Sequence, residues 1–272
     1  MLAITHYNAS DWENLLISKA KSNLEMKNYL ITAISNNGNL EFVLNLIASL
    51  TLHGYKKFLI ICLDIELYEN LIKYGFVNHI VLVPPSWIPY TPTSKATSWQ
   101  TKDYQFLTQT KTHIVYRLLV HGFTILLTDV DLVWLSPHIL KYIDFVAPKR
   151  DFIYAVDDQV DVNTGFYVVR PTSGGKKIFE AIIERQRTDH DNDQFVANRV
   201  FRAKKDLLNN SCPLDKLLFT NGEVYHRNKL NQDLNIPALV FHANYLIGFE
   251  QKKKVLMDED SFISYGAIGT AS

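Results

Sequence analysis

Two aspartates that follow an apolar run are the residues of this chain best suited to bind a cation. Asp129 and Asp131 lie in the segment from Phe123 to Leu135, FTILLTDVDLVWL, between two runs of apolar side chains. A short apolar run rich in Ile and Leu is typical of a buried strand in an α/β sheet, and ligands collect where such strands end. Two carboxylates are too costly to bury there unpaired, so we expect a cation beside them.

The type of ligand around that cation indicates which ion would bind and which classes of function it would serve. Hard oxygen ligands that leave coordination positions open suit Mn²⁺ or Mg²⁺ bridging phosphate oxygens. The leading hypothesis is therefore a transferase that uses a nucleotide sugar. An Asp after a strand also often caps a helix or starts a turn, and short motifs recur by chance, so other segments must supply the rest of the site.

Two other classes of protein fit the same motif. Phosphatases of the haloacid dehalogenase type place Asp-x-Asp-x-(Thr/Val) after an apolar strand, as Asp129 to Val133 would allow. Their nucleophilic strand usually lies near the N-terminus, whereas several strand–helix units precede Asp129 here. The third class is a transferase fold that binds a sugar nucleotide without catalysis.

Lys111 interrupts the apolar face of a predicted helix. It shares one helical stripe with Leu107, Val115 and Leu118. Such a lysine can pack its stem and extend its ammonium group to water. Alternatively, it faces a bound phosphate or sugar.

Two polar segments lie between Asp129 and the C-terminal part. Asn163-Thr164-Gly165 precedes a predicted strand and is typical of a turn with a positive φ at glycine. Asp191-Asn192-Asp193-Gln194 opens a predicted helix, where Asp and Asn are preferred caps. In both segments, one polar side chain could instead point at substrate.

A histidine and a lysine run lie near the C-terminus. His242 ends a strand-like run, and Gly248 and Lys252-Lys253-Lys254 follow it. A lone histidine after apolar residues is more often structural than a ligand, and a lysine run usually lies in solvent. Beside a metal-binding imidazole, however, the lysines could close over a diphosphate, and the weak apolar pattern of residues 244–256 predicts a poorly packed loop.

Strands alternate with helices along most of the chain, which predicts a single α/β domain with a mostly parallel sheet and helices on both faces. Strands are predicted at residues 29–35, 58–64, 79–83, 123–127, 152–156, 166–169 and 238–242. Helices are predicted at residues 43–50, 65–74, 103–121 and 177–186, with a short helix after Asp193 and a loop at residues 87–101.

Composition excludes some partners. Lys plus Arg and Asp plus Glu number 28 each in 272 residues, so no global attraction to nucleic acid or an anionic membrane follows. Cys62 and Cys212 do not make a disulfide framework. The first residues lack a basic stretch followed by an apolar one, and no window resembles a membrane span, so we expect a cytoplasmic protein.

Four blocks in the expected order resemble the signature segments of nucleotide-diphospho-sugar transferases of glycosyltransferase family 77, and more distantly of family 8. The blocks are LLTDVDLVWL, NTGFYVVRP, DNDQFVANRV and FHANYLIGFEQKKK. The resemblance covers residues 29–256. It implies a GT-A fold for this range, preceded by a helical lead (residues 1–28) and followed by a tail (residues 257–272).

The resemblance also implies roles for individual residues. Asp129, Asp131 and His242 match the metal ligands, and Asp129 also matches a residue that contacts the sugar-nucleotide donor. Donor contacts are implied for Asn36, Lys111, Asn163, Gly248 and Lys252. Asp193 and Gln194 match the positions around the transferred sugar, where catalysis takes place.

The implied activity is a Mn²⁺-dependent transfer, with Mg²⁺ as the alternative ion, that retains the anomeric configuration. The donor would be a UDP-sugar, with UDP-galactose and UDP-xylose as first candidates. The acceptor would be a hydroxyl of a glycan or glycoprotein. Retention could proceed by same-face attack or through a covalent intermediate, and the sequence does not choose between them.

Overall fold

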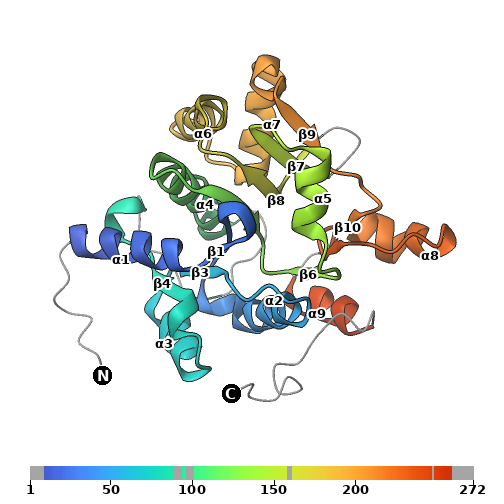
Figure 1. Ribbon diagram of the computed structural model, residues 1–272, viewed down its shortest axis with the longest axis horizontal. Coiled ribbons are helices and arrows are strands. Elements are labelled where there is room, and N and C mark those ends of the chain that lie inside the picture. Colours follow the sequence, from blue (N-terminus) through green and yellow to red (C-terminus); the bar gives the residue numbers. More distant parts are fainter. Residues whose placement is uncertain (1–8, 89–93, 96–100, 158–160, 247, 259–272) are drawn as a thin grey trace.

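The fold is organised around an eight-stranded sheet with helices on both faces (Figure 1). The computed structural model describes residues 9–88, 94–95, 101–157, 161–246 and 248–258. The strands of this sheet are β1 (Leu24–Glu25), β2 (Tyr29–Ser35), β3 (Leu59–Cys62), β4 (Ile80–Leu82), β5 (Thr124–Thr128), β7 (Phe152–Val156), β8 (Val162–Val169) and β9 (Ser211–Pro213). The helices are α1 (Ala9–Ser22), α2 (Leu40–Leu52), α3 (Ile65–Lys73), α4 (Lys102–Val120), α5 (Ile139–Val146), α6 (Ser173–Gln186), α7 (Asp193–Ala203), α8 (Leu230–Asp233) and α9 (Phe249–Asp258).

The strand order is β4-β3-β2-β5-β8-β7-β9, and β1 pairs with β2. The β4, β3, β2 and β5 strands are parallel neighbours, as helical crossovers require. The β8 strand is antiparallel to both β5 and β7. The predicted α/β class and mostly parallel mixed sheet are therefore confirmed: β8 interrupts the parallel order, and β7 and β9 beyond it again pair in parallel.

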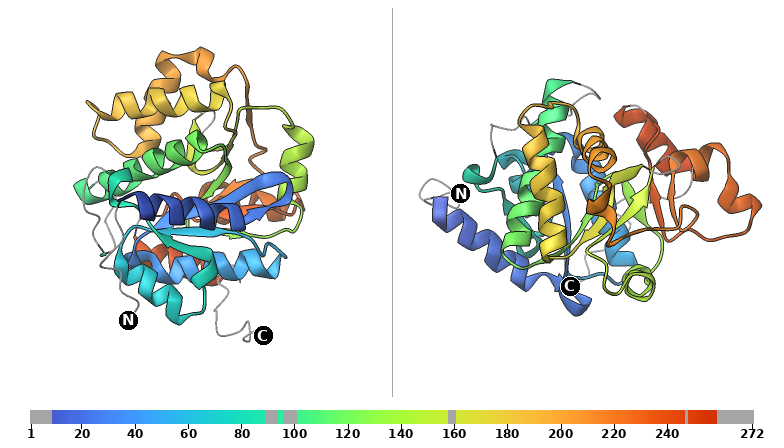
Figure 2. Two further views of the ribbon diagram at one scale, coloured as in Figure 1. Left: turned by 60° about the vertical axis from the view of Figure 1, so that its left-hand side comes forward. Right: turned by 90° about the horizontal axis from the view of Figure 1, so that it is seen from above.

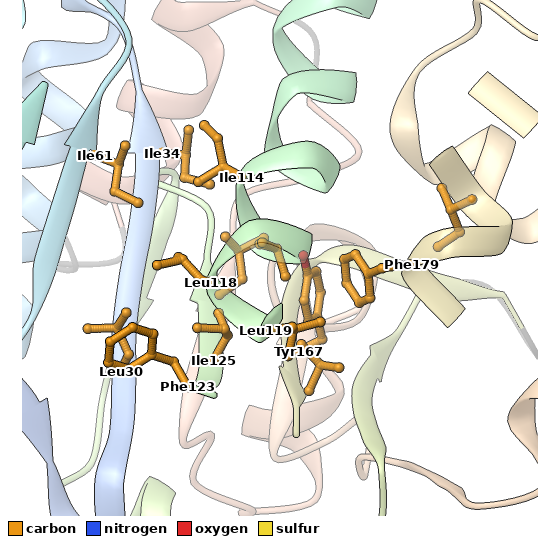
Figure 3. Close-up of a cluster of buried hydrophobic side chains, with 14 of the residues drawn as sticks. Leu30, Ile34, Ile61, Ile114, Leu118, Leu119, Phe123, Ile125, Tyr167 and Phe179 are labelled. Carbon is orange, nitrogen blue, oxygen red and sulfur yellow. The ribbon is translucent and has the colours of Figure 1, made fainter. Parts of the chain in front are cut away.

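Alternation along the buried strands divides the core into two layers. On β2, Leu30 and Ile34 face one layer, whereas Ile31 and Ala33 face the other. The first layer packs under α1, α4, α6 and α7. Figure 3 shows the part of this layer in which α4 residues and Phe179 of α6 lie against the sheet. The second layer packs under α2, α3 and α5, so helices cover both faces of the sheet (Figure 2).

A second, three-stranded sheet contains the strand that follows the aspartate motif and the strand that ends at His242. Its order is β10 (Phe219–Asn221), β11 (Val240–His242) and β6 (Leu132–Trp134). Because β11 pairs antiparallel with β6, His242 lies opposite Leu132, the residue after Asp131. The indole ring of Trp134 is fully buried between Tyr55 and Phe166, which anchors this sheet on the second layer.

Most predicted elements occur within a few residues of their predicted ends. The strands at 29–35 and 152–156 have the predicted bounds, and α7 begins at Asp193. Gly54 and Gly75 end helices with φ of +82° and +88°, as their positions predicted. Most of the predicted loop at residues 87–101 lies outside the described residues, as does the C-terminal tail from residue 259.

Two predictions about local structure are wrong. Asn163-Thr164-Gly165 is not a turn, because β8 already begins at Val162 and Gly165 has no positive φ. The predicted poorly packed loop at residues 244–256 is a helix from Phe249 onward, because α9 forms there and buries Val255 and Leu256. In both places, pairing with a distant segment supplies the order that the local pattern lacks.

The predicted helical lead packs on the sheet. Leu16 and Ala20 of α1 are fully buried in the first layer, and β1 pairs with β2. The boundary at residues 28 and 29 stays a prediction, although many contacts cross it. No helix among the described residues is long and apolar enough to cross a membrane.

We predict that Leu16→Ala lowers the free energy of unfolding by about 2–5 kcal/mol, because it opens a cavity in the first layer. Asn14 is on the exposed face of the same helix, so Asn14→Ala should change that free energy by less than about 0.5 kcal/mol. Urea denaturation measures both. Equal midpoints for the two variants would mean that α1 is not part of the domain core.

Candidate metal centre and active site

The candidate metal ligands come from three segments that meet at strand ends. Asp129 directly follows β5, and its backbone N–H donates to the carbonyl of Gly165 on β8 at 2.7 Å. Asp131 directly precedes β6, and its carbonyl accepts from the N–H of Ala243 at 3.0 Å. His242 is the last residue of β11. Backbone pairing in both sheets thus sets the positions of all three side chains.

Asp129, Asp131 and His242 form a compact set of ligand atoms. One ligand atom from each residue lies within 4.8 Å of the others. His242 Nε2 lies 3.3 Å from Asp131 Oδ1. Asp131 and His242 are buried, whereas Asp129 is partly open. Two carboxylates and one imidazole, open on one side, are a donor set that suits a divalent metal ion.

Gly165 leaves the space that this set needs. A Cβ atom there would lie 2.5 Å from His242 Cε1 and 2.9 Å from Asp129 Oδ2. Both distances are far shorter than carbon contacts in proteins. The residues present therefore fit a metal ion, and the glycine is required by close approach and not by backbone conformation.

The buried charge of Asp131 is balanced by two neighbours. Lys252 Nζ on α9 donates to Asp131 Oδ2 at 2.5 Å. Burial alone would raise the pKa of the Asp131 carboxyl, but the charges of Lys252 and His242 hold that pKa well below its usual range. Asp131 is therefore an anion, as a metal ligand must be.

Lys111 lies between two carboxylates and does not reach water. Its ammonium group donates to Asp129 Oδ1 at 2.9 Å and lies 3.3 Å from Asp193 Oδ2, with the residue only 5% exposed. Burial acts to lower the pKa of Lys111, but Asp129 and Asp193 outweigh it and raise that pKa well above the usual value. Lys111 therefore faces the site, whereas Val115 and Leu118 of the same stripe pack in the first layer of the core.

Asp193 and Gln194 open α7 beside Lys111. Asn192 caps this helix and accepts from the N–H of Phe195, so the Asp193 side chain is free to point to Lys111. Burial, together with the charge of Asp129, raises the pKa of Asp193 despite that ion pair. A buried carboxylate of this kind suits stabilisation of positive charge on a substrate.

The other predicted donor residues surround this centre at different distances. Asn163 accepts from the N–H of Gly165 at 2.7 Å and so lies next to the metal ligands. Asn36, which follows β2, is fully buried and donates to the carbonyl of Lys95. Gly248 precedes α9 with φ +96°. None of these contacts tests donor binding, so these roles stay predictions.

The three consecutive lysines are separated by the phase of α9. Lys252 reaches Asp131, whereas Lys253 pairs with Glu41 on α2 at 2.5 Å. Lys254 is exposed. The sequence alone did not show which lysine belongs to the site, and the structure brings only Lys252 of the three to the metal ligands.

Two residues of the site were not identified from the sequence. Asp157, which follows β7, accepts hydrogen bonds from Asn163, Gln194 and Asn244. Asp157 lies in none of the four sequence blocks, and Asn244 lies in the last of them without a role assigned to it. The signal for them lies in the fold, because the end of β7, the start of β8 and the end of β11 come together only in the folded chain.

The geometry agrees with the family that comparison with known proteins identifies. The family model for nucleotide-diphospho-sugar transferases matches residues 53–256, well over half of the chain. The chain belongs to this family, as the sequence blocks predicted. Nothing in the comparisons supports a phosphatase.

Curated relatives are transferases of galactose or xylose. The UDP-galactose:fucoside alpha-3-galactosyltransferase of Dictyostelium discoideum is 29% identical over 178 residues, which are 56% of this chain and 26% of that protein. The UDP-D-xylose:L-fucose alpha-1,3-D-xylosyltransferase 3 of Arabidopsis thaliana is 23% identical over 92% of this chain and 70% of its own length. The chain thus corresponds to only about a quarter of the first relative.

Solved glycosyltransferases share the fold. GlyE of Streptococcus pneumoniae superposes with a TM-score of 0.57 at 13% identity, over 90% of this chain and 62% of its own. The galactosyltransferase LgtC gives 0.53 at 12% identity, over 89% of this chain and 96% of its own. At such identities, the likeness establishes the fold alone.

We predict that Gly165→Ala lowers the affinity for Mn²⁺ in the presence of UDP by about 10-fold or more, because its methyl group displaces His242 or Asp129. The backbone at Gly165 has no positive φ, so the variant adds no backbone strain and should still fold. Calorimetric titration with Mn²⁺ and UDP measures the affinity. Unchanged binding by Gly165→Ala would show that this triad is not the metal centre.

Proposed function

We propose that the protein is a metal-dependent, retaining glycosyltransferase that uses a UDP-sugar. The observation that carries the proposal is the open triad of Asp129, Asp131 and His242 with Lys252 beside it. This arrangement offers a cation and a basic group to the two phosphates of a nucleotide sugar. Membership of the nucleotide-diphospho-sugar transferase family supports the same substrate class.

Asp129, Asp131 and His242 would hold Mn²⁺, with Mg²⁺ as the alternative ion. A bound ion there supplies positive charge that stabilises the departing diphosphate. Lys252 adds a second positive charge on the same side. In the absence of donor, this lysine neutralises Asp131; with donor, the phosphate oxygens give it a second partner.

The sugar would lie against the amide and carboxylate groups at the start of α7. As the bond to phosphate breaks, the sugar ring becomes positively charged. The buried carboxylate of Asp193 stabilises that charge or orients the acceptor hydroxyl. Lys111 holds Asp193 and Asp129 in fixed positions, so the carboxylates need not reorganise during the reaction.

The relatives suggest the donor and acceptor classes. Their names specify UDP-galactose or UDP-xylose as donor, and a fucoside or L-fucose as acceptor. We therefore propose UDP-galactose or UDP-xylose as the donor and a hydroxyl of a fucose-containing glycan or glycoprotein as the acceptor. A cytoplasmic location stays an expectation from the sequence.

We predict Mn²⁺-dependent release of UDP from UDP-galactose or UDP-xylose in the presence of methyl α-L-fucoside. Asp131→Asn and His242→Ala should each abolish this release, because each removes a metal ligand. Asp206→Asn and His138→Ala are matched controls at exposed positions and should react as the unaltered protein does. A coupled assay for UDP measures the rates.

The outcomes separate the three function classes. No UDP release with either donor, but retained binding of Mn²⁺ and UDP, would indicate a binding protein. Release of inorganic phosphate from small phosphate esters would indicate a phosphatase. UDP release that persists in both Asp131→Asn and His242→Ala would reject the proposed metal centre.

We further predict that an α-linked UDP-sugar yields an α-linked product. The coupling constant of the anomeric proton in the product NMR spectrum measures this. A β-linked product would contradict retention while leaving the transferase activity intact.

A further inference from the structure

One carboxylate outside the metal centre gathers three side-chain amides. Asp157 Oδ1 accepts from Asn163 Nδ2 at 3.2 Å and from Asn244 Nδ2 at 2.8 Å. Its Oδ2 accepts from Gln194 Nε2 at 2.6 Å. The three amides belong to β8, to the segment after β11 and to α7. These parts of the chain also contain the candidate residues for binding the sugar nucleotide, for binding metal and for catalysis.

The other end of each amide is fixed by a backbone N–H group. Thr164 N donates to Gln194 Oε1 at 3.3 Å, and Gly165 N donates to Asn163 Oδ1 at 2.7 Å. Gly222 N donates to Asn244 Oδ1 at 3.2 Å. A backbone N–H can only donate, so each amide must turn its oxygen to the backbone and its NH₂ group to residue 157.

This orientation determines the chemistry required at position 157. Both oxygens must accept hydrogen bonds, which an ionised carboxylate does and an asparagine amide cannot. An asparagine there would point its NH₂ group at one of the three NH₂ groups, or force an amide to flip and leave a backbone N–H without its acceptor. Within the described ranges, Asp157 has no lysine or arginine partner, so amide hydrogen bonds alone support its charge.

We propose that Asp157 is a positioning residue for sugar transfer, an inference that rests on the proposed function. It holds the amides of Gln194 and Asn163 in one orientation against the transferred sugar. Asp157 does not contact Asp129, Asp131 or His242 through its carboxylate, so it should not set the affinity for metal and diphosphate. The two halves of donor recognition are therefore separable by mutation.

The separation predicts a kinetic signature for Asp157→Asn. The turnover number kcat for UDP release should fall about 100-fold, since small displacements of positioning groups have effects of that size. The dissociation constant of Mn²⁺ with UDP and the KM for the donor should stay within about 3-fold of the unaltered protein. A residue with only a structural role would change the melting temperature and both binding constants together.

Two further variants make the test specific. Asp161→Asn is the matched control, because Asp161 lies beside Asp157 and binds Arg202 at the surface, and it should leave kcat unchanged. In a background that carries both Asn163→Ala and Gln194→Ala, adding Asp157→Asn should lower kcat by less than about 3-fold further, because both amides that Asp157 is proposed to orient are already absent. A full 100-fold additional loss in that background would overturn the proposal.

Asp157→Glu covers the case in which Asp157→Asn does not fold. It keeps both accepting oxygens but moves them by one methylene, so it should fold and lose about 10-fold or more in kcat. Unchanged kcat in Asp157→Glu or in folded Asp157→Asn would overturn the role of Asp157 alone. Unaltered protein that releases no UDP would reject the proposed function, and this inference with it.

Discussion

The balance of buried charge at the carboxyl ends of β5 and β11 is the constraint on which the rest of the structure depends. Asp131 and Asp193 are buried and Asp129 is partly open, and carboxylates so close together repel one another. Lys111 and Lys252 offset this repulsion from two helices that are far apart in the sequence. The placement of α4 and α9 is therefore coupled to the site, because each helix brings one positive charge to it. A divalent cation would supply the positive charge that the two lysines do not provide to these carboxylates.

Backbone pairing converts that charge balance into fixed geometry. His242 and Leu132 are partners in the small sheet although more than a hundred residues separate them, and the pairing places the imidazole over Asp131. On the other side, the hydrogen bond from Asp129 N to Gly165 O ties the motif to β8. Ligands held by two sheets need little reorganisation to accept a metal ion, which is the physical basis of preorganisation.

The sequence predicted the features that depend on the local pattern of residues, and it missed those that depend on contacts between distant segments. Fully buried strands such as residues 29–35 are continuous apolar runs in the sequence, so the sequence predicted where they begin and end. The family resemblance named the three residues of the candidate metal triad, which the structure brings together. The helical stripe could not show whether Lys111 reaches water or carboxylates. Asn163-Thr164-Gly165 has the composition of a turn, yet pairing with β5 and β7 holds it in a strand. Asp157 had no local signal, because its three partners meet only after the sheet has formed.

The contacts divide the site into two parts of different chemistry. One part is charged, and contains the metal ligands, Lys111 and Lys252; it suits the diphosphate that all UDP-sugars share. The other part consists of amides oriented by Asp157, whose hydrogen bonds depend on direction more than on charge. Galactose and xylose differ in the configuration at C4 and in a hydroxymethyl group, whereas the diphosphate of their UDP-sugars is the same, so the charged part cannot discriminate between them. In the proposed reaction, the choice of sugar must therefore come from the amide part, where an unsatisfied buried hydrogen bond is the usual source of discrimination.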